Sequence, residues 1–189
     1  LMTILVGIKN GYVPKADAVS RLTTALQFLQ NANRFHGAWP HWIDGNSGAV
    51  IPFGTKDNGG DLVETAFLAQ GLICVREYFK NSTDATELAL SKKADDLWKG
   101  IEWNWYTQGQ NVLYWHWSPN YNFEMNHQLQ GFDETLITYV LAAASPNYSI
   151  DKSVYTQGWA KNGAIKSTGT QYGIPLVVNH NGATGTVGP

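Results

Sequence analysis

The sequence is poor in charge, in cysteine and in long apolar runs, and each shortage excludes a class of protein. Only 15% of the 189 residues are charged, the formal net charge is −2 and no basic cluster occurs, so nucleic acid and an anionic membrane surface are not expected partners. The single cysteine, Cys74, rules out an internal disulfide framework, and its apolar neighbours predict a buried structural thiol. No apolar run approaches the roughly 18 residues that a membrane-spanning helix needs, so membrane insertion is not expected.

Aromatic residues, by contrast, are abundant. They make up 13% of the chain and include 8 tryptophans. Several stand in two stretches without helical periodicity, 35–60 and 107–131, each of which exceeds what a passive connection needs. Large apolar side chains are costly to expose in loops, and flat rings stack on sugar faces, so these loops predict a carbohydrate site. The alternative is that the rings only pack the loops against the core.

Apolar periodicity predicts that most of the remaining chain is helical. The expected helices cover 1–8, 16–31, 61–79, 85–105 and 133–144. No alternation of strand and helix indicates a parallel sheet. Helix pairs that recur at about 35–45 residues are typical of an all-α array of helical hairpins, either a solenoid or a closed toroid. The chain begins within a helical pattern and ends on a Gly-rich stretch, so we expect residues 1–189 to form a single, incomplete domain.

Three carboxylates form the most distinctive polar pattern. Asp57, Asp61 and Glu64 are spaced i, i+4 and i+7, which on an α-helix places them on one stripe. Like charges at this spacing resist joint ionisation, and glycoside hydrolysis needs one protonated and one ionised carboxyl group. The alternative is a solvated helix start, where acidic residues compensate the helix dipole.

Two further acids are candidates. Glu134 follows an aromatic loop and, with Asp133, opens the last predicted helix, where dipole compensation is the alternative role. Glu124 lies within the second loop, where a surface salt bridge is the alternative.

The histidines do not indicate a metal site. His36 and His41 are five apart and His116 and His127 are eleven apart, so neither pair has the His-x-x-x-His spacing of a helical zinc site. The chain also has no phosphate-binding loop of the Gly-x-x-x-x-Gly-Lys-Ser/Thr type and no Gly-x-Ser-x-Gly nucleophile motif. No metal and no cofactor are therefore expected.

Three longer motifs resemble a known family. Gly37–Gly45 reads GAWPHWIDG, Thr55–Ala66 reads TKDNGGDLVETA, and Leu113–Tyr121 reads LYWHWSPNY. In these motifs, and over nearly all of residues 1–180, the chain is similar to the bacterial glycoamylase-like domain family, which contains proteins labelled putative glucoamylases, β-1,2-glucanases and a region of cyclic β-1,2-glucan synthases. The resemblance implies an (α/α)6 toroid with a substrate groove at one end, and an inverting glycoside hydrolase that acts on a glucan, most specifically a β-1,2-linked one.

The resemblance also implies roles for residues. Asp57, Asp61 and Glu64 would line the groove with Glu134, either Glu64 or Glu134 would donate the proton, and the two aspartates would tune the donor or position water. Contacts to the oligo- or polysaccharide are expected from Trp39, His41, Trp42, Trp115, His116, Trp117, Tyr121, Glu124 and His127.

Family domains are roughly twice as long as this chain. The resemblance therefore implies that this chain has the remaining half of the domain as a binding partner. The resemblance also leads us to expect that the protein works in the periplasm or at the cell surface of a bacterium.

Two other functions remain open from the sequence alone. A non-catalytic glucan-binding module would need the aromatic rings but not the carboxylates. A polysaccharide lyase on the same fold would need a Tyr, His or Arg base and a cationic partner for a uronic acid. Arg34 is the one arginine near the aromatic loops, which disfavours the lyase.

Overall fold

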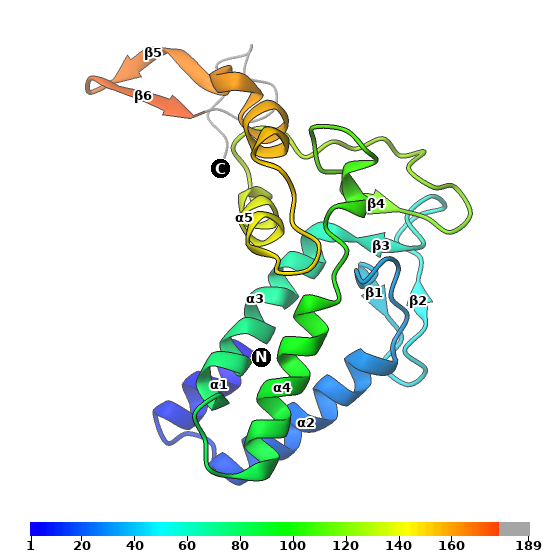
Figure 1. Ribbon diagram of the computed structural model, residues 1–189, viewed down its shortest axis with the longest axis vertical. Coiled ribbons are helices and arrows are strands. Elements are labelled where there is room, and N and C mark those ends of the chain that lie inside the picture. The colour runs from blue at the N-terminus through cyan, green and yellow to red at the C-terminus, as the bar shows by residue number, and fades with distance from the viewer. Residues whose placement is uncertain (178–189) are drawn as a thin grey trace.

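The computed structural model describes residues 1–177, except for the side chains of 167, 168, 171 and 175–177. This part of the chain is mostly helical, as the periodicity predicts (Figure 1). None of its helices is both long and apolar enough to span a membrane. The α-helices are α1 (Met2–Lys9), α2 (Lys15–Asn31), α3 (Leu62–Phe79), α4 (Ala85–Lys99) and α5 (Leu136–Ala144).

Short antiparallel pairs of strands lie within the aromatic loops and beyond the last α-helix. β3 and β4 join the two loops, since Gly60 pairs with Trp117 and Asp61 with His116. β1 pairs with β2 inside the first loop, a strand pair that the sequence did not predict. The strands are β1 (Trp42–Ile43), β2 (Val50–Ile51), β3 (Gly60–Asp61), β4 (His116–Trp117), β5 (Lys166–Gln171) and β6 (Ile174–Val177), and the shorter helical turns are η1 (Trp105–Thr107), η2 (Val154–Trp159) and η3 (Lys161–Gly163).

Helix α3 lies at the centre of the helical part and contacts α1, α4 and α5. Its sequence is apolar nearly all round, which is typical of a helix inside a larger assembly. Leu62, Val63, Ala66 and Leu72 are fully buried. Cys74 is half-buried rather than buried, and packs against the edge of this core.

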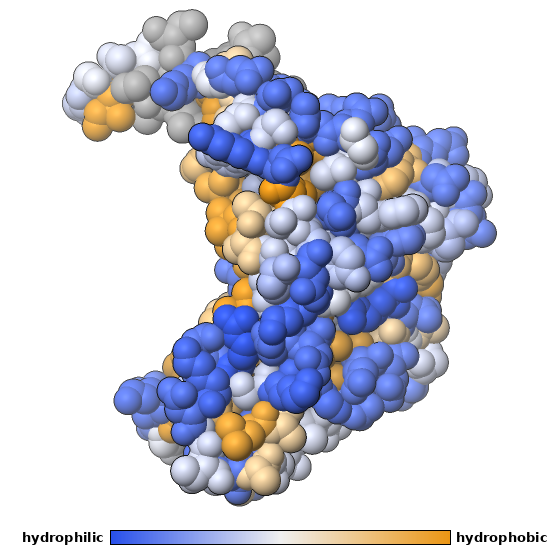
Figure 2. All heavy atoms as spheres, in the orientation of Figure 1, coloured by the Kyte–Doolittle hydropathy of each residue, from blue (hydrophilic) through white to orange (hydrophobic). Residues whose placement is uncertain are grey.

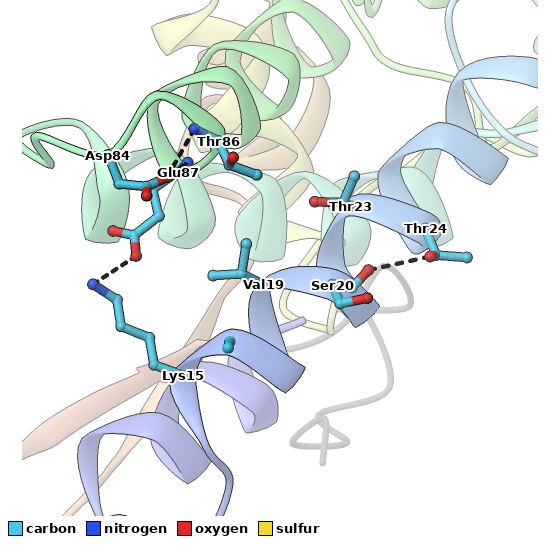
Figure 3. A pocket seen from close by; sticks show the side chains of 9 residues that line it. Lys15, Val19, Ser20, Thr23, Thr24, Asp84, Thr86 and Glu87 are labelled. Carbon is cyan, nitrogen blue, oxygen red and sulfur yellow. Dashed lines mark hydrogen bonds and ion pairs between the residues drawn. The ribbon is translucent and has the colours of Figure 1, made fainter.

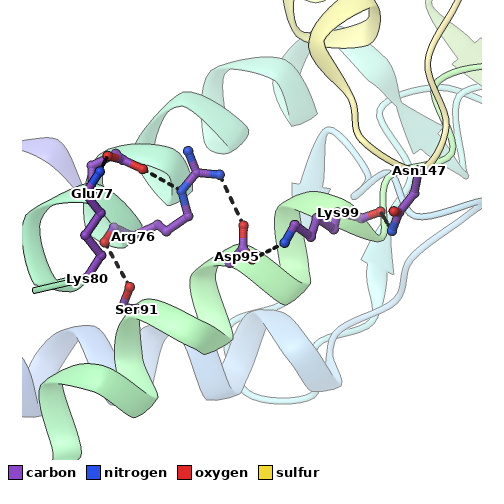
Figure 4. Close-up of polar contacts among 7 residues, drawn as sticks. All are labelled: Arg76, Glu77, Lys80, Ser91, Asp95, Lys99 and Asn147. Atoms are coloured by element: carbon purple, nitrogen blue, oxygen red, sulfur yellow. Dashed lines mark hydrogen bonds and ion pairs between the residues drawn. The ribbon is translucent and has the colours of Figure 1, made fainter.

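Polar contacts fix α4 alongside α3 (Figure 4). The Arg76 Nη1 atom lies 3.1 Å from Asp95 Oδ1, and Asp95 also pairs with Lys99 one turn further along α4. The Ser91 hydroxyl donates a 2.9 Å hydrogen bond to the carbonyl oxygen of Arg76. Partly exposed ion pairs add little stability singly, so their main effect is to set the register of the two helices.

Two helix boundaries differ from the prediction. α4 ends at Lys99 and not at residue 105, because the chain turns at Gly100 and the Glu102 amide then donates a hydrogen bond to the carbonyl oxygen of His36. Trp103, which falls within the range expected for this helix, therefore lies in the following turn and is fully buried. α5 begins at Leu136 and not at residue 133, because the Asp133 carboxylate accepts hydrogen bonds from Thr135 in a local turn.

Close approach of the β3 backbone to a buried ring requires glycine at position 60. A Cβ atom at Gly60 would lie 2.0 Å from the hydroxyl oxygen of Tyr106, which donates a 2.7 Å hydrogen bond to Phe35. We expect Gly60→Ala to lower the free energy of unfolding by about 1–3 kcal/mol through overpacking. Urea denaturation of the full-length protein measures this. Gly54→Ala is the control, because a Cβ there meets nothing within 4 Å, and equal losses in both variants would contradict the prediction.

Exposed apolar side chains lie on three neighbouring helices. α3 contacts both α1 and α5. Val6 is exposed on α1, Phe67 on α3 and Val140 on α5. Figure 2 shows apolar side chains along the concave edge of the molecule, beside α3 and α5. Contiguous exposed apolar surface marks a site of contact with further protein.

Candidate active site

The three carboxylates do not form a helical stripe, so that prediction was wrong. Glu64 alone lies within α3, whereas Asp57 lies in the preceding loop and Asp61 in β3. The reason is the extended conformation of Asp61 (φ −108°, ψ 109°), which is fixed by pairing with β4. The carboxylates are nevertheless brought together, because the loop from Asp57 leads directly into the N-terminus of α3.

Asp61 is a buried carboxylate with a partner for each oxygen. Its Oδ1 atom accepts hydrogen bonds of 3.0 Å from the amides of Val63 and Glu64 and so caps α3. Its Oδ2 atom lies 2.9 Å from Nδ1 of His41, and its side chain is fully buried. Since Asp61 has no free oxygen facing solvent, it suits a positioning role for the imidazole and for the first turn of α3.

His116 lies between two carboxylates. The β3–β4 register places it opposite Asp61, and its Nε2 atom lies 3.1 Å from Asp57 Oδ2 and 3.8 Å from Asp61 Oδ2. Its Nδ1 atom is buried without a hydrogen-bond partner among the described residues. Two buried carboxylates this close repel each other when both are ionised, and the imidazole ring of His116 contacts both of them.

The same three residues could hold a divalent cation. One ligand atom each from Asp57, Asp61 and His116 lies within 4.8 Å of the others. Carboxylate oxygen and imidazole nitrogen are ligand types that divalent metals accept. The histidine spacing did not indicate this group, because its members come from two loops that meet only through β3 and β4. The expectation that no metal is required stays a prediction.

Glu64 is the exposed carboxylate of the cluster. Partial burial raises the pKa of its carboxyl group, and repulsion from Asp61 and Glu134 raises it further, while His41 opposes the shift. A carboxyl group with a raised pKa keeps its proton closer to neutral pH, as a general acid must.

The raised pKa of Glu64 predicts a pH-dependent stability. Where the folded-state pKa exceeds the unfolded value, the folded protein binds the extra proton, so stability is lost as pH rises from the ordinary value through the raised one. The glutamine side chain of the Glu64→Gln variant is uncharged at every pH, so the variant does not lose stability through this carboxyl group as pH rises. We therefore expect the variant to gain thermal stability relative to wild type as pH is raised from about 4 to about 7, measured by thermal unfolding of the full-length protein.

Glu77, at the far end of α3, provides the matched control. Lys80 and Arg76 hold the pKa of the Glu77 carboxyl below its usual value. Its contribution to stability is therefore present above the unfolded pKa and lost as pH falls. Glu77→Gln should lose stability relative to wild type over the same rise in pH, and a trend of the same sign in both variants would contradict the assignment at Glu64.

A pocket of about 730 Å³ opens beside Asp57 and His116. Its size is within the usual range for a small-molecule site. It combines carboxylate, imidazole and aromatic groups, which suits a ligand with both hydroxyl groups and apolar faces. Its lining residues include His41, Phe53, Lys56, Asp57, Trp115, His116, Met125 and His127.

The other residues predicted to bind sugar differ in exposure and in their position relative to the pocket. Trp39 is 2% exposed and its indole N–H donates to the carbonyl oxygen of Leu29, so it belongs to the core and cannot stack on a sugar. Trp42 is half exposed and packs edge-on against Phe53 at the pocket. Trp117 packs on the other side of β4, against Trp105.

The remaining predicted residues lie in the second loop and just beyond it. Glu124 is exposed and pairs with Lys56, which agrees with the salt-bridge alternative. Tyr121 is half-buried in the turn around Ser118, whose hydroxyl accepts a hydrogen bond from the Tyr121 amide. Glu134 is exposed ahead of α5 and acts electrostatically on Glu64.

The lining residues that the sequence reasoning missed include two large apolar ones, Phe53 and Met125. Both are exposed apolar side chains in the polar loops. A large apolar residue in a loop otherwise rich in polar residues is the signal that could have identified them.

A second cleft, of about 710 Å³, lies between the N-terminal turns of α2 and α4 (Figure 3). Its two carboxylates have structural partners. Asp84 accepts hydrogen bonds from the amides of Thr86 and Glu87, and the Glu87 carboxylate lies 2.7 Å from Lys15 Nζ. These contacts occupy the acidic groups of the cleft, so neither carboxylate is free of a structural partner.

The chain is similar to proteins that act on β-1,2-linked glucans. Residues 126–188 match the model of a family described as Putative glucoamylase. The chain is 47% identical over 163 residues to the exo β-1,2-glucooligosaccharide sophorohydrolase (non-reducing end) of Parabacteroides distasonis, in a match that covers 85% of this chain and 22% of that protein.

Solved structures show the same likeness. The endo-β-1,2-glucanase from Chitinophaga pinensis, in a complex with sophorotriose and glucose, superposes with a TM-score of 0.90 at 54% identity, covering 95% of this chain and 43% of that chain. A putative glucoamylase from Bacteroides caccae superposes with a TM-score of 0.90 at 50% identity, in a match that covers 96% of this chain and 44% of that chain. The chain therefore spans less than half the length of these relatives.

Proposed function

We propose that this chain, which belongs to the family of glycoamylase-like glycoside hydrolases, supplies part of the active site of an enzyme that hydrolyses β-1,2-linked glucan. The observation that carries the proposal is the raised pKa of the exposed Glu64 carboxyl group beside the buried, fully bonded Asp61. The β-1,2-glucan activity named for two relatives supports the substrate class.

In the proposed mechanism, Glu64 donates a proton to the glycosidic oxygen as the bond to the anomeric carbon breaks. An ionised carboxylate, for which Glu134 is the candidate, takes a proton from the water that attacks the opposite face of the sugar. An inverting enzyme holds the two carboxyl groups about 6.5–9.5 Å apart to leave room for that water. Asp61 is a positioning residue, because its oxygens bind the first turn of α3 and His41.

Asp57 and His116 have a supporting role in this proposal. The 3.1 Å contact between Asp57 Oδ2 and His116 Nε2 lies on the wall of the pocket beside β4. Trp42 and Trp115 expose aromatic surface near the same pocket, and His41 and His127 offer imidazole nitrogens to sugar hydroxyl groups.

We also propose that the helices described belong to a single (α/α)6 toroid whose other helices lie outside this chain. Two observations support this arrangement. The relatives are more than twice as long as the matched segment, and apolar side chains are exposed along a concave edge beside α3 and α5 (Figure 2). The further helices would cover these side chains.

The test is incubation of the full-length protein with linear β-1,2-glucan. We expect release of reducing sugar, with the new anomeric centre inverted when products are followed by proton NMR from the first turnover. Binding without turnover would show a glucan-binding module instead. A new absorbance from a C=C bond in the product would show a lyase.

A further inference from the structure

A second aromatic hollow lies on the side of β4 away from the acidic cluster. Successive side chains of a strand point to opposite faces, so His116 faces Asp57 while Trp117 faces His36 and Trp105. The hollow has a volume of about 480 Å³, and its lining residues differ from those of the acidic pocket. It is therefore a separate concave surface, here called the Trp105 hollow and lined by Glu102, Asn104, Trp105, Gln108, Phe123 and Tyr148.

The indole ring of Trp105 is held in place by His36. Their rings stack with centroids 3.7 Å apart and planes inclined by 10°, and Trp117 meets the His36 ring edge-on at 4.8 Å. His36 Nδ1 also lies 3.0 Å from Glu102 Oε2, which fixes the imidazole and the carboxylate together. One face of Trp105 is thus covered, yet the residue stays 42% exposed and lines the hollow.

The polar groups of the hollow indicate its ligand. Glu102 offers a carboxylate that accepts hydrogen bonds, and the exposed amides of Asn104 and Gln108 both donate and accept. No lysine or arginine is among its lining residues, so an anion has no counter-charge there. A flat apolar face bordered by acceptors and amides matches a neutral sugar, whose C–H face packs on a ring while its hydroxyl groups bind the rim.

We propose that the Trp105 hollow is a second, non-catalytic binding site for a glucan chain, which holds the polymer while the acidic cluster cleaves it. The inference rests on the proposed glucan hydrolysis and extends it to a site without a catalytic carboxyl pair. In this proposal a long chain occupies both sites, whereas a short oligosaccharide occupies one at a time. The site should therefore affect polymer binding and leave turnover of short substrates unchanged.

The experiment uses the full-length protein and compares polymeric β-1,2-glucan with the trisaccharide of the same linkage. Trp105→Ala should raise KM for the polymer about tenfold, the equivalent of about 1.4 kcal/mol, with kcat and the trisaccharide kinetics unchanged. Asn104→Ala, which removes an exposed rim amide, should raise the polymer KM in the same direction. Tyr12→Ala is the control, because Tyr12 is an exposed ring outside both pockets.

Each outcome decides the proposal. Loss of the His36 stack could destabilise the Trp105 variant, so thermal unfolding is measured in parallel and Asn104→Ala carries the test if Trp105→Ala unfolds. Equal losses on polymer and trisaccharide, or an unchanged polymer KM in the folded variants, would overturn the second site. Wild-type protein that hydrolyses neither substrate would instead overturn the proposed function, and comparing titrations of the polymer into wild-type and Asn104→Ala protein would then test the hollow alone.

Discussion

Replacement of Glu64 by glutamine is expected to lower kcat for glucan hydrolysis about 10²–10⁴-fold, the contribution typical of a positioned general acid. Glutamine keeps the shape of the side chain but has no proton to give to the leaving oxygen. The fold should persist, because Glu64 is exposed at the first turn of α3 and the cap from Asp61 does not involve its side chain. The measurement is reducing-sugar release from linear β-1,2-glucan by the full-length protein.

Glu77→Gln is the matched control for activity as well as for stability. It makes the same chemical change on the same helix, at an exposed position paired with Lys80, far from the acidic cluster in sequence. We expect its activity to equal that of wild type. Glu134→Gln should also lose activity if its carboxylate activates the water. Undiminished hydrolysis by both Glu64→Gln and Glu134→Gln would rule out this pair of roles.

Replacement of Asp61 by alanine is expected to lower the free energy of unfolding by about 2–4 kcal/mol, the combined cost of a lost helix cap and of a lost hydrogen bond to a buried carboxylate. Two losses combine in this variant. The amides of Val63 and Glu64 lose their cap, and His41 loses the oxygen that binds its ring. Urea denaturation of the full-length protein would measure the change.

Asp84→Ala separates these two losses. Asp84 caps α4 through the amides of Thr86 and Glu87 with distances like those at Asp61, but it is exposed and has no histidine partner. Its removal should cost about 1 kcal/mol, as for an ordinary helix cap. If both variants lost the same amount, the imidazole contacts of Asp61 would contribute nothing and the positioning role would fail.

Most helices could be predicted from the sequence because their signals are local. The apolar spacing of Val19, Leu22 and Leu26 gave α2 nearly to its ends, and the apolar composition of 61–79 correctly indicated a buried α3. The errors fell at one end of two helices. The chain leaves α4 at Gly100, and the Glu102 amide then bonds the distant His36, whereas the local Asp133–Thr135 turn delays the start of α5.

The sequence indicated which acidic and imidazole groups lie near one another better than it indicated how they are arranged. Spacing alone suggested a helical stripe, because sequence cannot show that Gly60 and Asp61 pair with a strand from the second loop. That pairing brings His116 to Asp57. The tryptophans show the same limit, since Trp39 and Trp42 stand three apart in one motif, yet Trp39 is buried in the core and Trp42 is half exposed.

The ribbon of β3 and β4 has a consequence for the order of folding. It joins two loops that are distant in the chain, as do the side chains of Asn58 and Ser118, 60 positions apart. Closing a loop of that length before α3 and α4 have packed costs chain entropy that few contacts repay. We therefore expect the helical hairpin to form first and the imidazole–carboxylate cluster to close late, so that the His116 ring signals report the last step of folding.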